Sequence, residues 1–475
     1  MVQGVAADDN SDDMFVIGKD KVPRKNLICL TDAQKDAKRN TWKRIMQNVK
    51  CVVAPMVDQS ELAFRMMLRE HGADLCFSPM IHAQLFVKDV TYRKSAFSSC
   101  SSDRPLVIQF CANEPDILLS ACLLVEDICD GVDLNLGCPQ LIAKRGHYGA
   151  YLQEDIELVC EMVSIIHSYC HVPLSCKIRI LDDIDKTLSY ARALEKAGAC
   201  MLTVHGRTRE QRGASTGLAD WNAIRIVREA VNIPVLANGN IQMPEDVQEC
   251  LKVTDAKGVM SAEGVLSNPF LFEARHEPNW IVAKEYLKFA RRYKAGMSAV
   301  RAHLFRICHH SLLEYNDLRE KMSYVFTLRE FHEIIDGIED RINSVILTDD
   351  ATCYKNCCKT QPCAPCPLDL PHWICKPYFR PQRNDSVVSN SSYRERRRAE
   401  LDALAEETGL SRRQIRKREK RRIEGRKDQS KKESYPKCVR CTLPASQGCI
   451  FLFCKNCCRY KASHEHSDCK GTYFV

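Results

Sequence analysis

The stretch DLNLGCPQ, Asp133 to Gln140, places a cysteine directly after an apolar, strand-like run. Gly137 and Pro139 flank Cys138 and favour a tight turn that would aim its side chain away from the strand. A thiol with a reference pKa of about 8.5 keeps its proton near neutral pH, so it could serve as a general acid. Cysteines are more often small buried hydrophobic residues. The position at a strand end nevertheless favours catalysis for Cys138.

Polar residues and special turns follow the other apolar runs of this region in the same way. They are APM at 54–56, Gln109, Lys177 with Arg179, HGR at 205–207, NGN at 238–240 and SAEG at 261–264. Backbone N–H groups of the two last glycine-containing turns can bind a phosphate. A lysine, an amide and an imidazole can hydrogen-bond a polar ring. These groups together predict a phosphorylated planar cofactor. FMN fits best, because a lysine near the flavin N1/C2 carbonyl region would stabilise the reduced anion.

Eight short β-branched or apolar runs would have to position these side chains. The runs begin at Cys51, Leu75, Leu106, Val132, Leu174, Met201, Pro234 and Gly258. Segments with apolar residues at helical spacing, such as DILLSACLLVEDI and TLSYARALEKAGA, lie between them. Strands that are apolar on both faces and alternate with helices predict a parallel α/β sheet. Eight repeats predict a (β/α)8 TIM barrel with its site at the carboxyl ends of the strands. An open doubly wound sheet is the alternative.

Composition divides the chain into six regions. We predict an N-terminal extension over 1–44, the barrel over 45–280, a helical bundle over 281–350, a Cys/Pro-rich segment over 351–383, a basic helical linker over 384–436 and a Cys/His module over 437–475. The acidic N-terminus lacks the order of a signal peptide, and no apolar run is long enough to span a bilayer. We therefore expect a cytoplasmic or nuclear protein with no membrane partner.

The last region carries the spacing of a zinc ribbon. Cys438 and Cys441 form one C-x2-C pair, and Cys454 and Cys457 form a second, which together predict a tetrahedral structural Zn²⁺ site. Spare donors nearby leave room for a second, interleaved zinc ion: Cys449, Cys458, His464, His466 and Cys469. The cysteines between 353 and 375 are less regularly spaced; they could bind metal or only pack beneath the barrel, and we do not include them among the predicted ligands.

The net charge of the chain is concentrated in one segment. Residues 394–432 hold 16 Lys or Arg against 8 Asp or Glu, which equals the whole excess of +8 in the chain. A local positive block suggests an anionic partner such as nucleic acid. SRRQIRKREKRR, from Ser411 to Arg422, would form either a basic helix that contacts RNA phosphates or a nuclear-localisation signal. A solvated charged helix is the alternative.

Several motifs, in their order along the chain, resemble the dihydrouridine synthase family, which uses FMN to reduce uridines in tRNA. The motifs are APMV, DLNLGCPQ with AKRGHYGAYL, CKIRI, LTVHGRT and ANGNI. The similarity covers about residues 45–350. Details of NLGCPQLIAKRGHYGAYL and HWICKPY are most similar to the eukaryotic branch that acts on uridines 16 and 17 of the tRNA D-loop.

This resemblance implies a mechanism and a set of site residues. NADPH, or NADH, would reduce FMN, flavin N5 would deliver a hydride to C6 of the uracil, and Cys138 would protonate C5. The implied flavin contacts are Pro55, Met56, Val57, Gln109, Lys177, His205, Asn238, Gly239, Asn240, Ala262 and Glu263. A target base must leave its stack to reach a flavin. Residues near the barrel mouth could contact that nucleotide or its phosphates, namely Asn135, Lys144, Arg145, Arg179 and Arg207. Solvated or intramolecularly paired cations are the alternative.

Two rival functions share part of this pattern. A flavin enzyme of the dihydroorotate dehydrogenase type would have the same phosphate turns and lysine, but it would not account for the helical region or the basic tail. A non-catalytic RNA-binding protein would need no flavin. The sequence does not determine the oligomeric state, and a monomer is compatible with it.

Overall fold

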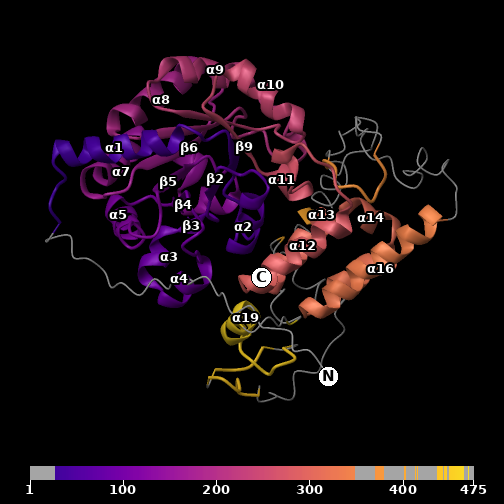
Figure 1. The fold of residues 1–475 in the computed structure, drawn as a ribbon. Coiled ribbons are helices and arrows are strands. Elements are labelled where there is room, and N and C mark those ends of the chain that lie inside the picture. Colours follow the sequence, from indigo (N-terminus) through magenta and orange to yellow (C-terminus); the bar gives the residue numbers. More distant parts are fainter. Residues whose placement is uncertain are drawn as a thin grey trace, which may run out of the picture.

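The computed structural model describes residues 27–347, 370–378, 401–402, 412, 414–415 and 436–469, the last range without 442, 447–448 and 465–468. Figure 1 shows a barrel, a group of helices at its side and a small Cys-rich module. Most of the predicted Cys/Pro-rich segment and basic linker lie outside the described residues, including five of the cysteines between 353 and 375.

Eight parallel strands close the barrel. They are β1 (Cys51–Val53), β2 (Leu75–Phe77), β4 (Leu106–Cys111), β5 (Gly131–Leu136), β6 (Leu174–Arg179), β7 (Met201–His205), β8 (Val235–Asn238) and β9 (Gly258–Ser261). β1 pairs with both β9 and β2, and β2 pairs with β4, so the sheet has no open edge. The two-residue β3 (Ile81–His82) pairs farther along β4. The predicted TIM barrel is confirmed, and the open doubly wound sheet is excluded.

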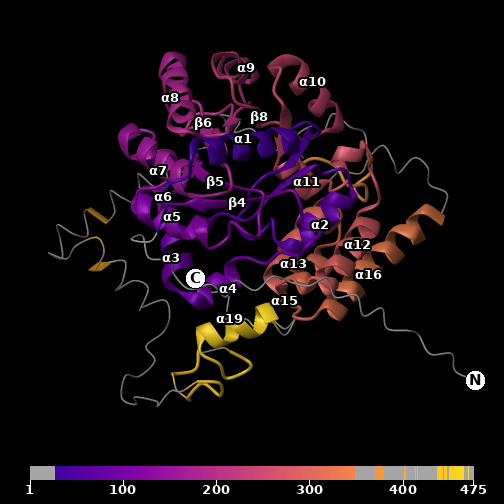
Figure 2. The same cartoon turned by 60° about the vertical axis from the view of Figure 1, so that its left-hand side comes forward.

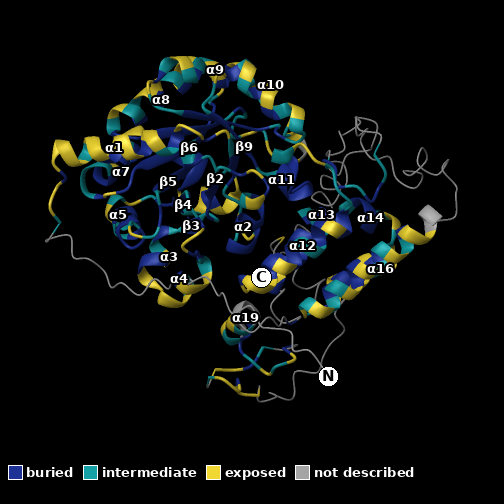
Figure 3. Ribbon diagram, in the orientation of Figure 1, coloured by how far each residue is buried: buried dark blue, intermediate teal, exposed yellow. Residues whose placement is uncertain are grey.

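Helices between the strands cover the outside of the barrel. They are α2 (Leu62–Glu70), α3 (Ala83–Lys88), α4 (Val90–Ala96), α5 (Pro115–Leu123), α6 (Leu141–Gly146), α7 (Ile156–Tyr169), α8 (Ile184–Ala197), α9 (Trp221–Ala230), α10 (Pro244–Thr254) and α11 (Glu263–Ser267). Their apolar faces pack with alternate strand residues in one large core cluster. Figure 3 shows the strands buried and the outer faces of α8, α9 and α10 exposed.

The other strand residues point into the barrel, where they form a separate apolar cluster at its amino-terminal end. Helix α1 (Asp32–Met46) closes this end, because its Trp42 and Met46 pack against inward residues such as Val52 and Leu236. A Cβ on Gly131 would lie 3.3 Å from the Trp42 ring, so the glycine makes room for it. The lower half of the barrel is therefore filled with apolar side chains, and chemistry is confined to the carboxyl end.

Five helices form the bundle beside the barrel: α12 (Asn279–Arg292), α13 (Met297–Ile307), α14 (His309–Glu314), α15 (Asn316–Tyr324) and α16 (Leu328–Leu347). α12 packs on α2 of the barrel. At this junction Glu61 accepts hydrogen bonds from Tyr286 Oη and His303 Nε2, both at 2.9 Å. Burial opposes ionisation of Glu61, but the nearby His303 outweighs it and lowers the pKa of this carboxyl. A buried polar contact therefore fixes the bundle on the barrel.

The Cys-rich module lies against the bundle. Its helix α19 (Lys455–His464) contacts α13, and Figure 2 shows α19 beneath the bundle helices. The segment 370–378 also joins the bundle, because Asn279 N donates to Trp373 O at 2.7 Å and Cys375 N donates to Glu277 O at 2.9 Å. None of the described helices combines the length and the apolar character that a membrane crossing requires.

Candidate active site

A connected set of buried polar side chains lies inside the barrel above its apolar lower half. Asp133 on β5 is fully buried, and its carboxylate accepts hydrogen bonds from Gln109 Nε2 at 2.8 Å and Ser175 Oγ at 2.6 Å. Burial raises the pKa of Asp133 to about 7, although both hydrogen bonds and the nearby Lys177 oppose the shift. A carboxyl group this deep needs such partners, because an unpaired buried charge is costly.

This set continues to the cysteine turn through two amides. Asn135 Nδ2 donates to Gln109 Oε1 at 2.9 Å. Asn135 Oδ1 in turn accepts the backbone N–H groups of Gly137 at 3.1 Å and Cys138 at 2.9 Å. Asp133 therefore orients Gln109, Gln109 orients Asn135, and Asn135 holds the backbone on which Cys138 sits. We call the three side chains of Asp133, Gln109 and Asn135 the relay.

Cys138 is half-buried at the carboxyl end of β5. Its carbonyl accepts from Ala150 N at 3.1 Å, which ties the turn to the 3₁₀ helix η2 (Gly149–Leu152). Gly149 has φ +67°, and a Cβ there would lie 2.9 Å from the Cys138 Cβ, so glycine is required for this close approach. Arg179 Nε also donates to Gly137 O at 2.9 Å. The thiol is thus held in one place without being sealed in the interior.

Lys177 is the cation nearest the centre of the carboxyl end. Its Nζ donates to Asn238 Oδ1 at 2.8 Å, and Asn238 Nδ2 donates to Met260 O at 2.9 Å, which fixes the orientation of the amide. Burial, and then the charge of Arg179, lowers the pKa of Lys177 to about 8. Lys177 therefore remains mainly charged at neutral pH and can donate to an electron-rich ring.

His205 ends β7 beside Arg207. Arg207 NH1 lies 3.1 Å from His205 Nε2, and Arg207 NH2 donates to Asn240 Oδ1 at 2.7 Å. Burial and the charges of Lys177, Arg179 and Arg207 lower the pKa of His205 well below its usual value, so the ring is neutral at pH 7. Since guanidinium can only donate, Nε2 is the acceptor and Nδ1 carries the proton. His205 is therefore a neutral hydrogen-bond donor at its Nδ1.

The turns after β8 and β9 offer free backbone donors. Within residues 27–347, no acceptor is found for the backbone N–H groups of Gly239, Asn240 and Ala262. The two strands are neighbours, so these donors lie at one side of the carboxyl end. Unpaired N–H groups at this position suit a phosphate. With Lys177, His205 and Asn238 nearby, the donors match the groups of a phosphorylated flavin.

The predicted site residues divide into those the barrel brings together and those at its outer margin. The first group lies on or just after strands β4 to β8 and consists of Gln109, Asn135, Cys138, Lys177, Arg179, His205, Arg207, Asn238, Gly239 and Asn240. Val57 is exposed beyond β1, while Pro55 and Met56 are half-buried. Ala262 and Glu263 lie at the start of α11, and Lys144 and Arg145 are exposed on α6.

Three of the residues predicted to contact the substrate also make hydrogen bonds within the protein. Asn135 belongs to the relay. Arg179 donates to the carbonyls of Gly137 and Thr208, the latter at 2.7 Å, and Arg207 donates to Asn240. These residues position the loops of the site, and direct contact with a substrate stays a prediction for them. Lys144 and Arg145, which are exposed, remain the more accessible cations.

Sequence reasoning missed Asp133, the buried end of the relay, and Ser175, which donates a hydrogen bond to it. Asp133, Asn135 and Gly137 follow one another at a spacing of two, so the alternation of a strand places them on one face. A polar inward face on β5 was therefore the available signal. Tyr151 and Arg212 were also missed: Tyr151 Oη donates to Pro139 O at 3.1 Å, and Arg212 donates to the same carbonyl.

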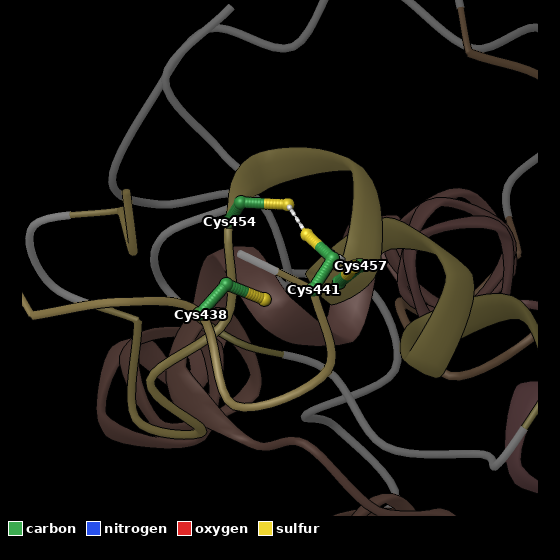
Figure 4. A group of neighbouring side chains, drawn as sticks. All are labelled: Cys438, Cys441, Cys454 and Cys457. Atoms are coloured by element: carbon green, nitrogen blue, oxygen red, sulfur yellow. Dashed lines mark hydrogen bonds between the residues drawn. The ribbon is translucent and has the colours of Figure 1, made fainter. Parts of the chain in front are cut away.

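The predicted metal ligands converge in the Cys-rich module. The sulfurs of Cys438, Cys441, Cys454 and Cys457 lie within 4.8 Å of one another, and Figure 4 shows them pointing toward a common centre. Two of the S···S distances, Cys441–Cys454 and Cys441–Cys457, are 3.5 Å. Zn–S bonds of about 2.3 Å in a tetrahedron place sulfurs about 3.8 Å apart. The group therefore has nearly the size that a four-thiolate zinc site requires.

Comparison with known proteins agrees with this architecture. The profile of the dihydrouridine synthase (Dus) family matches residues 52–347. A mouse protein named tRNA-dihydrouridine(16/17) synthase [NAD(P)(+)]-like is 46% identical over 434 residues, which cover 90% of this chain and 89% of the mouse protein. The Saccharomyces cerevisiae tRNA-dihydrouridine(16/17) synthase [NAD(P)(+)] is 42% identical over 70% of this chain and 83% of its own length. A mouse tRNA-dihydrouridine(20a/20b) synthase-like protein is 41% identical over 48% of this chain and 70% of that protein.

The fold and the site together define a TIM-barrel oxidoreductase with a cysteine at the barrel mouth. The chain belongs to the dihydrouridine synthase family. The mouse relative named for positions 16 and 17 matches 90% of this chain, which is more than the barrel and the helical bundle together, and the yeast relative matches 70% of it.

Proposed function

We propose that this protein reduces uridines at positions 16 and 17 of tRNA to dihydrouridine, with NAD(P)H as the source of electrons and FMN as the bound cofactor. The half-buried Cys138, held by the relay at the carboxyl end of the barrel, is the observation that carries the proposal. The names of the mouse and yeast relatives support the substrate, the two positions and the nicotinamide cofactor.

Reduction of the uracil C5=C6 bond adds a hydride to one of its two carbons and a proton to the other. FMN held at the carboxyl end by the residues named below would, in its reduced form, provide the hydride for C6 of the uracil. The Cys138 S–H bond breaks as a C–H bond forms at C5, and the thiolate then regains a proton from water. Negative charge builds on the uracil during hydride transfer. A proton donor aligned with C5 therefore lowers the free energy of the transition state. The relay keeps the thiol aligned by holding the backbone N–H of Cys138.

The chain's own groups can hold FMN at the carboxyl end. The N–H groups of Gly239, Asn240 and Ala262 would bind its phosphate, and Lys177 and His205 would donate to the ring. Pro55, Met56, Val57, Gln109, Asn238 and Glu263 complete the predicted contacts. Gln109 Oε1 accepts from Asn135 and its Nε2 donates to Asp133, so at most one N–H of this amide remains for the ring.

Purified protein tests this proposal directly. We expect it to carry FMN, to oxidise NADPH or NADH, and to form dihydrouridine at positions 16 and 17 of unmodified tRNA, mapped by mass spectrometry of nuclease fragments. Reduction of free pyrimidines as fast as tRNA would instead support the small-molecule dehydrogenase. Protein that binds tRNA but takes up no flavin would support the non-catalytic RNA-binding protein.

The relay gives a further prediction. Asn135→Ala removes the acceptor for the N–H groups of Gly137 and Cys138, and a displacement of the thiol by about 1 Å can lower the rate roughly 100-fold. We expect kcat for uridine reduction to fall by about 10- to 100-fold. FMN reduction by NADPH, measured by stopped-flow absorbance, should remain unchanged because the thiol takes no part in it.

A matched control is Asn232→Ala, which removes an exposed amide before β8, at the opposite end of the barrel. This variant should keep full activity. Equal activity in Asn135→Ala and Asn232→Ala would show that the relay does not position Cys138.

We further propose that Cys438, Cys441, Cys454 and Cys457 bind a structural zinc ion. The converging sulfurs and the two C-x2-C pairs support this site. We also propose that the basic segment around 411–422 contacts tRNA phosphates, because of its positive charge. Only residues 412 and 414–415 of this segment are described. Exposed Lys144 and Arg145 would add to this contact at the barrel mouth.

A further inference from the structure

We propose that the Cys-rich module binds a second zinc ion, separate from the four-cysteine site, through Cys449, Cys458 and Cys469. The three sulfurs lie within 4.8 Å of one another, and all three side chains are buried. Three thiolates around a tetrahedral ion lie about 3.8 Å apart, a spacing that falls within this range.

The hydrogen bonds around these sulfurs are those of metal-binding thiolates. Ile450 N donates to Cys469 Sγ at 3.2 Å, and Phe453 N donates to Cys449 Sγ at 3.3 Å. Backbone N–H donors stabilise the negative charge of bound thiolates, in the same way that outer hydrogen bonds tune other metal ligands. A purely apolar packing of three thiols would not call for donors aimed at the sulfurs.

The described part of the module lacks an apolar core that could fold it without metal. Among the described residues of 436–469, Ala445 is the only buried side chain that is not a cysteine. Around Cys449, Cys458 and Cys469 only Phe451 and Phe453 pack, and both are partly exposed. Domains of fewer than about 40 residues usually need disulfides or metals for stability. One four-cysteine site would leave the second group of buried thiols without a partner.

The two sites would interleave along the chain. Cys449 lies between the two C-x2-C pairs of the first site, and the neighbouring residues Cys457 and Cys458 on α19 belong to different sites. Each ion would therefore close a loop that contains ligands of the other. Three thiolates leave one position of a tetrahedral ion for a further ligand.

Zinc content of the full-length protein tests the proposal. Inductively coupled plasma mass spectrometry should find two zinc ions per wild-type chain. Cys449→Ser and Cys469→Ser should each hold one or fewer, while Cys29→Ser, which replaces an exposed thiol outside both groups, should keep two. FMN content should stay unchanged in all of them, because the barrel holds the flavin.

Cobalt exchange separates loss of the second site from collapse of the module. The Co²⁺ d–d bands, which lie to the red of the flavin absorption, should show two tetrahedral sites in the wild type and should lose one of them first in Cys469→Ser. A wild-type chain with no more than one zinc ion, or a Cys449→Ser variant with as much zinc as the wild type, would overturn the second site.

Discussion

Cys138→Ala is expected to lower the rate of dihydrouridine formation by about 10²- to 10⁴-fold, the usual contribution of a positioned general acid. Without the thiol, the proton for C5 of the uracil must come from water that no side chain orients. FMN content and the rate of flavin reduction by NADPH should not change, because the donors proposed for the FMN phosphate follow β8 and β9, on the other side of the barrel mouth. Single-turnover reactions with tRNA and prereduced enzyme measure the chemical step.

Two further variants make this result specific to the thiol at this position. Cys160→Ala replaces another half-buried thiol, on α7 outside the barrel, and should retain wild-type activity. Cys138→Ser keeps a hydroxyl in the same turn, but a hydroxyl is a far weaker acid, so its activity should stay close to that of the alanine variant. Product formation at the wild-type rate in Cys138→Ala would exclude Cys138 as the proton donor.

The barrel and the edge that carries the site could be predicted because both depend on local pattern. Each strand is a short apolar run, and the residue that follows it lies at the carboxyl end of the barrel regardless of how the outer helices pack. Lys177, His205, Asn238 and Cys138 therefore come together from separate strands, as the strand ends predict. Contacts within one turn, such as those of Cys438 with Cys441, are set by spacing in the same way.

The relay could not be predicted, because it depends on the register between neighbouring strands. The register pairs Gln109 with Asp133 and Asp133 with Ser175, which brings three side chains from three strands together. No single segment contains that information. The packing of α1 under the barrel likewise joins segments that are far apart in the sequence, because the Trp42 ring lies 3.3 Å from where a Cβ on Gly131 would be. For Asn135 and Arg179, which sequence reasoning assigned to substrate contacts, the structure adds hydrogen bonds within the protein that the sequence did not indicate.

Asp103→Ala is expected to destabilise the barrel by about 3–5 kcal/mol, which is the typical cost of removing one partner of a buried ion pair. Asp103 and Arg65 are both fully buried, and Arg65 NH2 donates to Asp103 Oδ2 at 2.6 Å. Arg69 Nε donates to Asp103 Oδ1 at 3.0 Å, and Ser99 Oγ to Oδ2 at 3.0 Å. The alanine variant would leave the Arg65 guanidinium charged and buried without a counter-ion. Thermal unfolding followed by circular dichroism should show a loss on the order of 10 °C.

The control for this variant is Asp36→Ala on α1. Asp36 and Arg39 form an exposed pair at 3.6 Å, and such pairs contribute about 0–1 kcal/mol. The melting temperature of Asp36→Ala should therefore lie close to that of the wild type. Similar melting temperatures for Asp103→Ala and Asp36→Ala would show that the buried pair contributes little.

The Asp103 carboxylate should also make the stability of the barrel depend on pH, and its removal should affect the active site. Burial alone would raise the pKa of Asp103, but the charges of Arg65 and Arg69 outweigh it and lower the pKa below its usual value. This contribution to stability is therefore complete above about pH 4, the pKa of Asp103 in the unfolded chain, and is lost as the pH falls through its pKa in the folded protein. Asp103→Ala should lack that part of the acid dependence.

Arg65 NH1 also donates to Ser60 O at 2.6 Å, and Ser60 Oγ accepts from Met56 N at 3.0 Å. Because Met56 is a predicted flavin contact, release of Arg65 should weaken FMN binding as well, which equilibrium dialysis of the variant at neutral pH would measure.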